Sequence, residues 1–551
     1  MQCKYSVTLL VLFFVVLVSS TCVDASQQDV IVNCLRTVSP TATIILEDDE
    51  RYNDFRIGTN FRYDNMFPTV IVAVKSIVDI QAGVICATNY SMVLDVMNGG
   101  HSYEGYSCGD SSIMLHMDDF NNATSFDRYS PSGPTVTVQS GMRLARLYGL
   151  VINETASWNA PYVIAGGTCP TVGVAGHILC GGYGLLGREV GLTSDQVRSM
   201  EVVLANASVV TVTADEHAEI FWALRGSCSA SFGVIATITL QLLPLSVPAV
   251  TLIKIPDYYY GDVNGVEVAL RIATWWQVWA SVRAPSQLSS TLHINDHSLR
   301  FQLVYLGPKE EAILQTLPAL TRGLKHTNFS AEDIKSFYVP GTFLDAVLWW
   351  SNDESITSLE DLMAVTALPP LSARNPSRRK TKSQLLTGPM QMEALRSLFA
   401  YRMNNELNQI EVKAYSYPAL AVPMLESESG GVGGDGVGGG TYATDLFTDS
   451  RSPLLRGHML EMHYGKSYVP SSTDNTTEQD AALVEGVNAI GRHLRNFFPR
   501  ALAYPGYIDA DLINPGADYF GVRNAQTLSL LRRKSDPHGV LSSRAGEYLY
   551  P

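Results

Sequence analysis

Two glycine-rich segments combine residue types that could hold a cofactor. In the first, residues 98–105 read NGGHSYEG and place His101 directly after two glycines. In the second, residues 165–197, glycines recur around Cys169. Glycine lets a backbone approach a ligand closely, and successive N–H groups in such loops form concavities that bind anions such as a pyrophosphate. The pattern indicates a cofactor cradle edged by a histidine and a cysteine, whereas two structural turns would have the same spacing.

Two stretches match G-x-G-x-x-G: residues 182–187, within the second segment, and residues 434–439. That fingerprint indicates a dinucleotide site only where a strand precedes the glycines and a helix follows them. The first match follows further glycines, and the second has no strand before it and no helix after it. Neither match therefore predicts a Rossmann fold.

Short strands and helices must position the two glycine-rich segments within the first 245 residues. Alternating apolar residues and turn signals predict a strand leading to a helix at 69–80, a strand and helix at 135–150, a hairpin with Asn206 in its turn at 201–213, and a strand at 231–245. The pattern favours a mixed α and β domain.

The composition of the sequence changes after Pro248, where glycine becomes rarer. The patterns predict strands at 251–255, 290–294 and 300–307, and helices at 265–282 and 310–324. We expect a separate α+β domain from them. Residues 430–440 contain eight glycines in eleven positions and predict a flexible loop or insertion, and a last helix is expected at 525–535, before Asp536-Pro537.

The composition and the N-terminus bound the class of protein. A net charge of -14 over 551 residues gives no basic excess with which to bind nucleic acid. Lys4 precedes an apolar run, Leu9 to Val18, which is typical of a signal peptide cleaved near Ala25, with an N-terminal anchor as the alternative. No membrane span is expected in the mature chain, and the protein is expected to be secreted.

Sequons and cysteines support this compartment. Six N-x-[ST] sequons predict a glycoprotein: Asn89, Asn122, Asn153, Asn206, Asn328 and Asn475. Six cysteines remain after signal cleavage, and some of them should pair where conditions are oxidising. None has the C-x-x-C spacing of a zinc site, so no metal is expected.

Several motifs together resemble the berberine-bridge-enzyme-like FAD-linked oxidases of the vanillyl-alcohol-oxidase group, which have a PCMH-type FAD-binding domain. These motifs are GGHSYEG at 99–105, GTCPTVGVAGH at 167–177, GGYGLLGREVGLTSDQV at 181–197, FWALRGSCSASFGVI at 221–235, YPGYIDADL at 504–512 and YFGVRNAQTLSLLRRKSDPHGV at 519–540. The resemblance extends in order from about residue 30 to 545, and it is weak in the middle of the chain.

The resemblance implies an α+β fold with two lobes. After a signal peptide at 1–25, residues 26–245 would form the PCMH-type FAD-binding domain, and a C-terminal berberine-bridge-like segment at 500–551 would complete this lobe. Residues 246–499, with the glycine-rich loop 430–440, would form an α+β substrate domain with an antiparallel sheet.

The resemblance further implies FAD held by two covalent bonds. His101 matches the histidine bonded to the 8α carbon, and Cys169 matches the cysteine bonded to carbon 6. Such bonds suit a secreted protein, because FAD is scarce outside cells and mass action would remove a reversible cofactor. The other cofactor contacts implied by the motifs are Asn98, Gly99, Gly100, Ser102, Gly173, Val174, Gly176, His177, Gly181, Gly182, Gly233, Val234 and Ile235.

The resemblance also suggests the catalytic residues. Tyr504 matches the first tyrosine of Y-x-N, the usual proton acceptor, while Tyr103 and Tyr183 match aromatic residues on the substrate side of the flavin. Glu461 and His463 share one face of a predicted strand and could bind a hydroxyl or assist the base, whereas a solvated strand face would show the same pattern. Val172 takes the place where a small residue lets oxygen reach the flavin, which favours an oxidase.

Some positions depart from the family pattern. Met97 replaces an arginine before the glycine pair, Ala175 replaces a glycine, and Cys180 replaces the first of three glycines. Residues 227–231 replace a glycine-rich run, and Gly506 stands where Y-x-N has its asparagine. A Cys180–Cys228 disulfide would join two cofactor-facing loops. Cys34 and Cys86 resemble the N-terminal disulfide of the family.

These observations predict a secreted FAD-dependent oxidase with a small-molecule substrate and molecular oxygen as its partners. It would oxidise an alcohol or hemiacetal carbon, first of all in a carbohydrate, by hydride transfer to flavin N5, and it would release hydrogen peroxide. Three alternatives remain open: an oxidase of an alkaloid-like or other small alcohol, a dehydrogenase that ignores oxygen, and a secreted flavoprotein that has lost catalysis.

Overall fold

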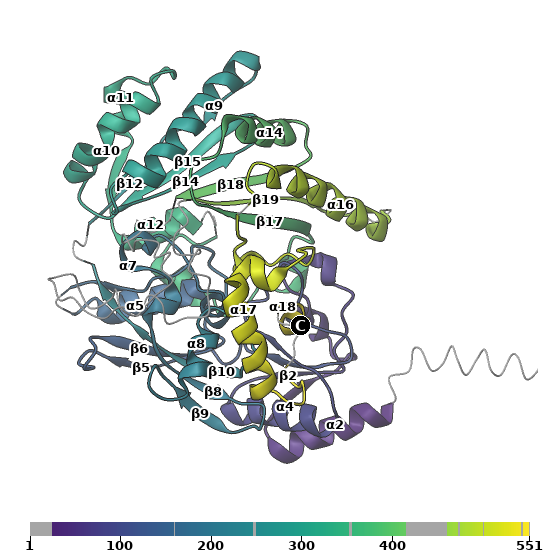
Figure 1. Ribbon diagram of the computed structural model, residues 1–551. Helices are drawn as coiled ribbons and strands as arrows, with labels where there is room; N and C mark the ends of the chain where they lie inside the picture. Colours follow the sequence, from purple (N-terminus) through teal and green to yellow (C-terminus); the bar gives the residue numbers. More distant parts are fainter. Residues whose placement is uncertain are drawn as a thin grey trace, which may run out of the picture.

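The computed structural model describes residues 25–158, 160–245, 249–351, 355–414, 460–471, 474–499, 501–541 and 544–549 (Figure 1). The predicted signal peptide, apart from Ala25, and the glycine-rich segment 430–440 lie outside these residues. Within the described ranges, no helix has both the length and the apolar character that a membrane span requires.

The first sheet is small and partly parallel. Its strand order is β1 (Thr43–Ile45), β2 (Val70–Ala73), β4 (Ile113–His116), β3 (Leu94–Met97). The strand predicted from residue 69 is β2, and it leads into α4 (Ile77–Asn89), which begins at a capping box formed by Ser76 and Asp79. The predicted Cys34–Cys86 disulfide is present and joins α2 (Ala25–Val38) to α4.

The second sheet is antiparallel. Its order is β5 (Ala123–Asp127), β6 (Thr135–Gln139), β10 (Val234–Gln241), β8 (Val197–Val203), β9 (Val209–Val212). The predicted hairpin is β8–β9, with Asn206 between the paired strands. The helices of this region are α3 (Tyr52–Arg56), α5 (Leu144–Thr155), α6 (Val174–Leu179), α7 (Gly187–Val190) and α8 (Ala218–Leu224), and β7 (Tyr162–Val163) pairs with β11 (Leu243–Pro244).

The third sheet is antiparallel and forms the upper part of Figure 1. Its order is β16 (Tyr338–Gly341), β12 (Val250–Ile253), β15 (Ser298–Tyr305), β14 (Leu288–Ile294), β18 (Gln409–Ala414), β19 (Leu460–Tyr468), β17 (Arg378–Leu386), and β13 (Tyr258–Tyr259) also pairs with β15. Its upper face carries α9 (Val263–Val278), α10 (Lys309–Gly323), α11 (Ala331–Ser336), α14 (Met392–Met403) and α16 (Thr476–Arg495).

The helix expected at 265–282 is α9, which begins at the Asp262 cap and gives way at Trp279 to a π-helical turn, Trp279–Arg283. Trp276 is fully buried between this helix and the sheet, and its indole N–H donates to Ser290 Oγ over 2.7 Å. Burying a large aromatic ring stabilises the contact of helix and sheet by about 2–3 kcal/mol. Helices α12 (Phe343–Ser351) and α13 (Leu359–Ala364) follow in the chain.

The C-terminal segment returns from the third sheet to the first two (Figure 1). A bridge between Leu385 and Leu502 brings it past β17, and the short turn η6 (Pro505–Tyr507) follows. Helices α17 (Pro515–Ser535) and α18 (Arg544–Leu549) complete the chain, with a bend in α17 at Gly521. The predicted helix end is confirmed, because α17 stops before Asp536, whose carboxylate accepts bonds from the Val540 and Leu541 N–H groups.

Candidate active site

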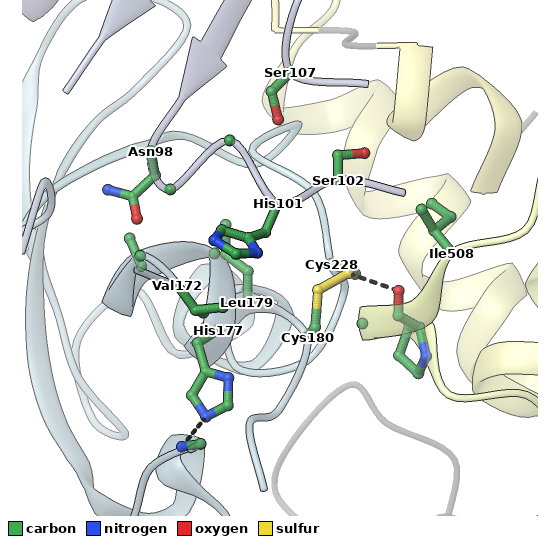
Figure 2. A pocket seen from close by; sticks show the side chains of 18 of the residues that line it. Asn98, His101, Ser102, Ser107, Val172, His177, Leu179, Cys180, Cys228 and Ile508 are labelled. Carbon is green, nitrogen blue, oxygen red and sulfur yellow. Dashed lines mark hydrogen bonds between the residues drawn. A yellow bond between two sulfur atoms is a disulfide. The ribbon is translucent and has the colours of Figure 1, made fainter. Parts of the chain in front are cut away.

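A cavity of about 520 Å³ lies where the three sheets and the C-terminal segment meet. The loop after β3, the glycine-rich loop around α6, and the loop before β10 contribute most of its wall (Figure 2). The turn η6 closes a further side. Arg379 of β17 and Lys413 of β18 reach it from the third sheet. Its volume is in the range of cofactor and ligand pockets.

His101 and Cys169 lie on this cavity and share one neighbour. The His101 Nε2 atom is 2.9 Å from Thr171 Oγ1, and Cys169 also forms a hydrogen bond with Thr171. Burial, helped by Arg143 and Arg379, lowers the pKa of His101 to about 3. The imidazole is therefore neutral at physiological pH, which is the nucleophilic form.

The Cys169 side chain is exposed because it faces the cavity. Protein atoms surround it closely on its other sides, and this burial raises the pKa of the thiol, although hydrogen bonds from Thr171 act in the opposite direction. The thiol is thus protonated at rest, and it needs a base or a nearby cation before it can act as a nucleophile.

Glycines let the backbones of the two glycine-rich segments, 98–105 and 165–197, touch. A Cβ atom on Gly99 would lie 2.3 Å from the Gly173 nitrogen, and a Cβ atom on Gly173 would lie 1.6 Å from Asn98 Oδ1. Gly100 has a φ of +68°, which other residues rarely adopt. The backbones of the two glycine-rich segments are therefore in direct contact, and a side chain at either glycine would separate them.

The Arg143 side chain joins the same two glycine-rich segments. Its Nη1 atom donates to the Gly99 carbonyl over 2.8 Å and to the Thr171 carbonyl over 2.5 Å, while Nη2 pairs with Asp118. Met97, which replaces the family's arginine, is buried in a small apolar cluster with Cys108. A buried cation therefore remains beside the cofactor loop, although it comes from the start of α5.

The cavity wall fits FAD on observations independent of the motifs. Among the described residues, Asn98 Oδ1 and Ser140 Oγ are buried without a hydrogen-bond partner, and both residues line the cavity. Buried polar atoms of this kind indicate a missing polar ligand. Together with a glycine backbone that admits close approach, they suit the hydroxyl and phosphate groups of a flavin nucleotide.

A cluster of tyrosines around Lys413 occupies the side of the cavity next to the third sheet. Lys413 Nζ is 2.9 Å from Tyr183 Oη and 2.7 Å from Tyr507 Oη, and the two hydroxyls bond to each other. The Tyr103 and Tyr507 rings stack at 5.4 Å with an interplanar angle of 10°. Burial raises the pKa values of Tyr183 and Tyr507 well above the usual range, and Lys413 partly opposes this for Tyr507.

Glu461 extends this cluster away from the cavity. It is the cross-strand partner of Lys413 in the β18–β19 ladder, with 3.7 Å between Lys413 Nζ and Glu461 Oε2. The same carboxylate oxygen is 3.3 Å from Tyr183 Oη. Burial raises the pKa of Glu461 to about 7, so this carboxyl can gain or lose a proton near neutral pH.

His463 is placed in a second layer. It lies two residues beyond Glu461 on β19, 2.7 Å from Gln409 Nε2 and 3.3 Å from a Glu411 carboxylate oxygen. Burial and Lys413 lower the pKa of His463 to about 3, so its ring is neutral. Glu461 and His463 are not among the described residues that line the cavity. Their effect on a ligand would therefore pass through Tyr183 and Tyr507.

Tyr504 lines the cavity beside these tyrosines. Its ring meets those of Tyr183 and Tyr507 edge-on at 4.9 and 5.3 Å, and its N–H donates to Ser383 Oγ over 2.9 Å. A Cβ atom on Gly506 would lie 2.4 Å from the Tyr504 ring. The Tyr504 ring thus rests on the backbone of Gly506, and this explains why no side chain stands at that position.

Most of the predicted cofactor contacts lie on the cavity. Its wall includes the predicted contacts Asn98, Gly99, Gly100, Ser102, Gly173, Gly176, His177, Val234 and Ile235, and also Val172, the predicted oxygen-access residue. His177 Nε2 accepts the Gly167 N–H over 3.0 Å, which holds one glycine-rich turn together. Val174, Gly181, Gly182 and Gly233 are outside the set of described residues that form the wall. Their role as cofactor contacts stays a prediction.

The suggested Cys180–Cys228 disulfide is present in the cavity wall (Figure 2). It joins the end of α6 to the loop before β10, and Cys228 Sγ lies 3.2 Å from the Pro505 carbonyl oxygen. It therefore fixes two loops of the cavity wall to each other, beside the turn that carries Tyr504 and Tyr507.

Sequence reasoning missed Lys413, Tyr507, Arg143 and Arg379. The alternation of QIEVKA at 409–414 marks a strand, and it places Glu411 and Lys413 on one face. Tyr507 is visible within YPGY, three residues after Tyr504. For Arg143 no local signal exists, because its two carbonyl partners are distant in sequence.

Comparisons with known proteins support an FAD-binding domain in this chain. Residues 68–213 match the FAD binding domain family. Berberine bridge enzyme-like 2 of Arabidopsis thaliana is 28% identical over 300 residues, 53% of this chain and 52% of that protein. Xylooligosaccharide oxidase of Thermothelomyces thermophilus is 36% identical over 172 residues, 31% of this chain and 33% of that enzyme. The chain thus spans about half the length of the first of these relatives and about a third of the second.

Among solved structures, the grass pollen allergen Phl p 4, which has glucose dehydrogenase activity, superposes with a TM-score of 0.74. The match covers 94% of this chain and 98% of the allergen at 20% identity. The predicted α+β PCMH-type fold is confirmed. In sequence and in fold the chain is similar to the berberine-bridge-enzyme-like FAD-linked proteins.

Proposed function

We propose that the protein is an FAD-dependent oxidase that acts on a CH–OH group of a carbohydrate. The observation that carries the proposal is one cavity that joins His101 and Cys169 on one side to the Tyr183–Lys413–Tyr507 cluster on the other. Relatives with a similar sequence or fold act on xylooligosaccharides and on glucose. FAD bound in the cavity would take a hydride from the substrate carbon and pass two electrons to oxygen, giving hydrogen peroxide.

The residues of the cluster would manage the proton of the substrate hydroxyl. Tyr507 and Tyr183 carry the hydroxyls that Lys413 contacts, and a phenolate formed there is stabilised by the ammonium. Glu461, bonded to Tyr183, can take the proton onward because its pKa is about 7. Tyr504 remains the alternative acceptor, since it also lines the cavity.

Release of electrons to oxygen is proposed on the basis of Val172. This side chain lines the cavity three residues after Cys169, on the wall expected to admit oxygen. A variant of Phl p 4 that includes an isoleucine-to-valine change is a glucose oxidase, whereas the variant without that change is a glucose dehydrogenase. A valine is therefore compatible with oxidase rather than dehydrogenase behaviour.

We also propose that both covalent flavin bonds form. The neutral imidazole of His101 is the form that bonds to carbon, and the Arg379 cation favours the thiolate of Cys169. Because Arg143 holds the carbonyls on either side of the site, the absence of an arginine at position 97 does not leave this loop without a cation.

Secretion and glycosylation are part of the proposal. All six sequon asparagines are exposed: Asn89, Asn122, Asn153, Asn206, Asn328 and Asn475. Glycans can be added only at accessible asparagines, so none of the six sites is sterically excluded by burial. Two disulfides are typical of proteins that fold in an oxidising compartment.

The test begins with the full-length protein secreted from a eukaryotic host. Acid precipitation should leave a yellow pellet, because covalently bound flavin does not dissolve with the supernatant. Peroxide release should then be measured with glucose, xylotriose, and a panel of aromatic and alkaloid alcohols. A colourless pellet together with no flavin in the supernatant would refute the oxidase. Peroxide from an aromatic alcohol but from no sugar would refute the carbohydrate substrate alone.

A further inference from the structure

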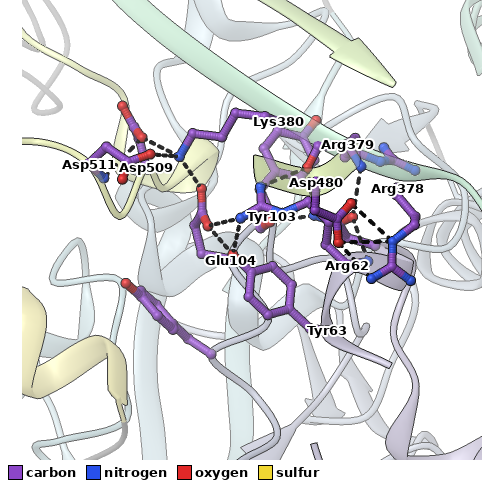
Figure 3. Close-up of polar contacts among 12 residues, drawn as sticks. Arg62, Tyr63, Tyr103, Glu104, Arg378, Arg379, Lys380, Asp480, Asp509 and Asp511 are labelled. Carbon is purple, nitrogen blue, oxygen red and sulfur yellow. Dashed lines mark hydrogen bonds and ion pairs between the residues drawn. The ribbon is translucent and has the colours of Figure 1, made fainter. Parts of the chain in front are cut away.

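A buried ammonium group joins two segments that carry active-site tyrosines (Figure 3). The Lys380 side chain on β17 is fully buried, and its Nζ atom is 2.7 Å from Glu104 Oε1 and 2.6 Å from Asp509 Oδ1. A third carboxylate, that of Asp511, is 2.6 Å away. Three short ion pairs to one nitrogen use all three of its N–H donors.

The carboxylates are satisfied on their other sides as well. Glu104 accepts a bond from the Tyr63 hydroxyl and lies 3.5 Å from Arg62 Nη2, while Asp509 also pairs with Lys382. Burial alone would lower the pKa of Lys380, but Glu104 and Asp509 outweigh it and raise the value. The ammonium is therefore charged at neutral pH.

Two of the three carboxylates that contact Lys380 lie just after the stacked tyrosines in the sequence. Glu104 directly follows Tyr103, and Asp509 is two residues after Tyr507. The Tyr103 and Tyr507 rings stack on each other, and both line the cavity. The two tyrosines come from segments some 400 residues apart, and β17 is the element that both segments share through Lys380.

We propose that Lys380 is a positioning residue that sets the Tyr103–Tyr507 stack against the ligand. The inference rests on the proposed function for its kinetic part and on the contacts alone for its structural part. Both rings line the cavity, whereas Lys380 is not among the described residues that line it. Lys380 holds the backbone next to each, and Asn60 strengthens the first attachment by donating from one amide to the carbonyls of Tyr103 and Arg379.

A simple stability role accounts for the cluster less well. Charges taken out of water lose much of their hydration energy, and apolar residues of the same volume are often as stable as a buried ion pair. An ionic cluster does define geometry sharply, because each short ion pair fixes a distance and a direction. Placing such a cluster one and two residues from two stacked tyrosines therefore constrains their spacing more strictly than apolar packing would.

The test compares three variants of the full chain with the wild type. Lys380→Met removes the tie, Lys380→Arg keeps its charge, and Arg378→Met is the matched control. Arg378 lies on the same face of β17 and pairs at 2.7 and 2.9 Å with Asp480 and Asp64, but its partners are not next to either tyrosine. Hydrogen exchange of residues 97–109 and 502–512 is measured together with kcat and KM for glucose and xylotriose.

We expect Lys380→Met to raise hydrogen exchange in both segments at once and to lower kcat by about 10- to 100-fold with little change in KM, because misplacement by about 1 Å has such an effect. Lys380→Arg should recover at least part of kcat. Arg378→Met should lower thermal stability and leave both segments and kcat near wild type.

A double variant, Lys380→Met/Asp511→Asn, separates charge balance from the tie. It restores the net charge of the cluster without rejoining the two segments, so kcat should stay low. Recovery of kcat in this variant, or unchanged exchange in both segments of Lys380→Met, would overturn the proposal. If the wild type oxidises none of the alcohols tested, the proposed function fails, while the exchange measurements still decide whether Lys380 holds the two segments.

Discussion

Replacing Lys413 by glutamine tests the proposed chemistry most directly. Lys413 Nζ lies 2.7 Å from Tyr507 Oη and 2.9 Å from Tyr183 Oη, so the variant removes a cation from both hydroxyls while keeping a polar side chain. Glutamine is also close to lysine in length without the charge. The variant therefore changes the electrostatics more than the packing.

The expected size of the effect follows from this distance. At 2.7 Å and an effective dielectric constant of about 20, a full charge on the Tyr507 oxygen would interact with the ammonium by about 6 kcal/mol. If roughly half of that charge develops in the transition state, the barrier rises by about 3 kcal/mol, which slows the reaction by about two orders of magnitude. Loss of the cation should also raise the pKa of Glu461, which Lys413 normally lowers.

The assay is the anaerobic reduction of the bound flavin, followed by its absorbance after rapid mixing with the best substrate of the wild type. Lys413→Arg is the control for charge, and flavin content and thermal midpoint control for folding. We expect the glutamine variant to be slow and the arginine variant to be intermediate. A rate within threefold of wild type for Lys413→Gln, with normal flavin content, would refute the role of Lys413 in stabilising a phenolate.

Three further predictions concern other parts of the site. Because the pKa of Glu461 is raised from 4.5 to about 7, the folded protein binds an extra proton between these values, and stability falls as pH rises through this window. The Glu461→Gln variant lacks this titration, so its stability should not fall in the same window. The unfolding free energy of the variant minus that of the wild type should therefore be up to about 3 kcal/mol more favourable to the variant at pH 8 than at pH 4, as measured by urea denaturation. His101→Ala and Cys169→Ala should each keep flavin in the acid pellet, and only the double variant should release it, as absorbance will show. Arg143→Met, which frees the Gly99 and Thr171 carbonyls, should lower the flavin content and the thermal midpoint, whereas an unchanged flavin content would exclude Arg143 from holding the cofactor loops.

Local patterns were sufficient to predict much of the fold. The alternation at 201–213 predicts the β8–β9 hairpin, and the helical spacing after residue 141 predicts α5, because both depend on residues close together in the chain. The end of the helix before Asp536 was predictable for the same reason. The π-helical turn after Trp279 was not predictable, because the pattern at 265–282 indicates one continuous helix.

The site was only partly predictable from the sequence. The jaws around His101 and Cys169 are marked by glycines and by a family resemblance. The pairing of Lys413 with Glu461 depends on the register of β18 and β19, whose facing residues are separated in the sequence by residues 415–459. Cross-strand register is set by the buried faces of a whole sheet, and no local pattern specifies it.

Three cysteines, Cys169, Cys180 and Cys228, line one cavity, and this affects how the protein matures. A thiol beside a disulfide can attack it and exchange partners, and the rate depends on the fraction present as thiolate. The raised pKa of Cys169 keeps that fraction small while Cys180 and Cys228 pair. The same burial that makes Cys169 a slow nucleophile thus protects it from disulfide exchange.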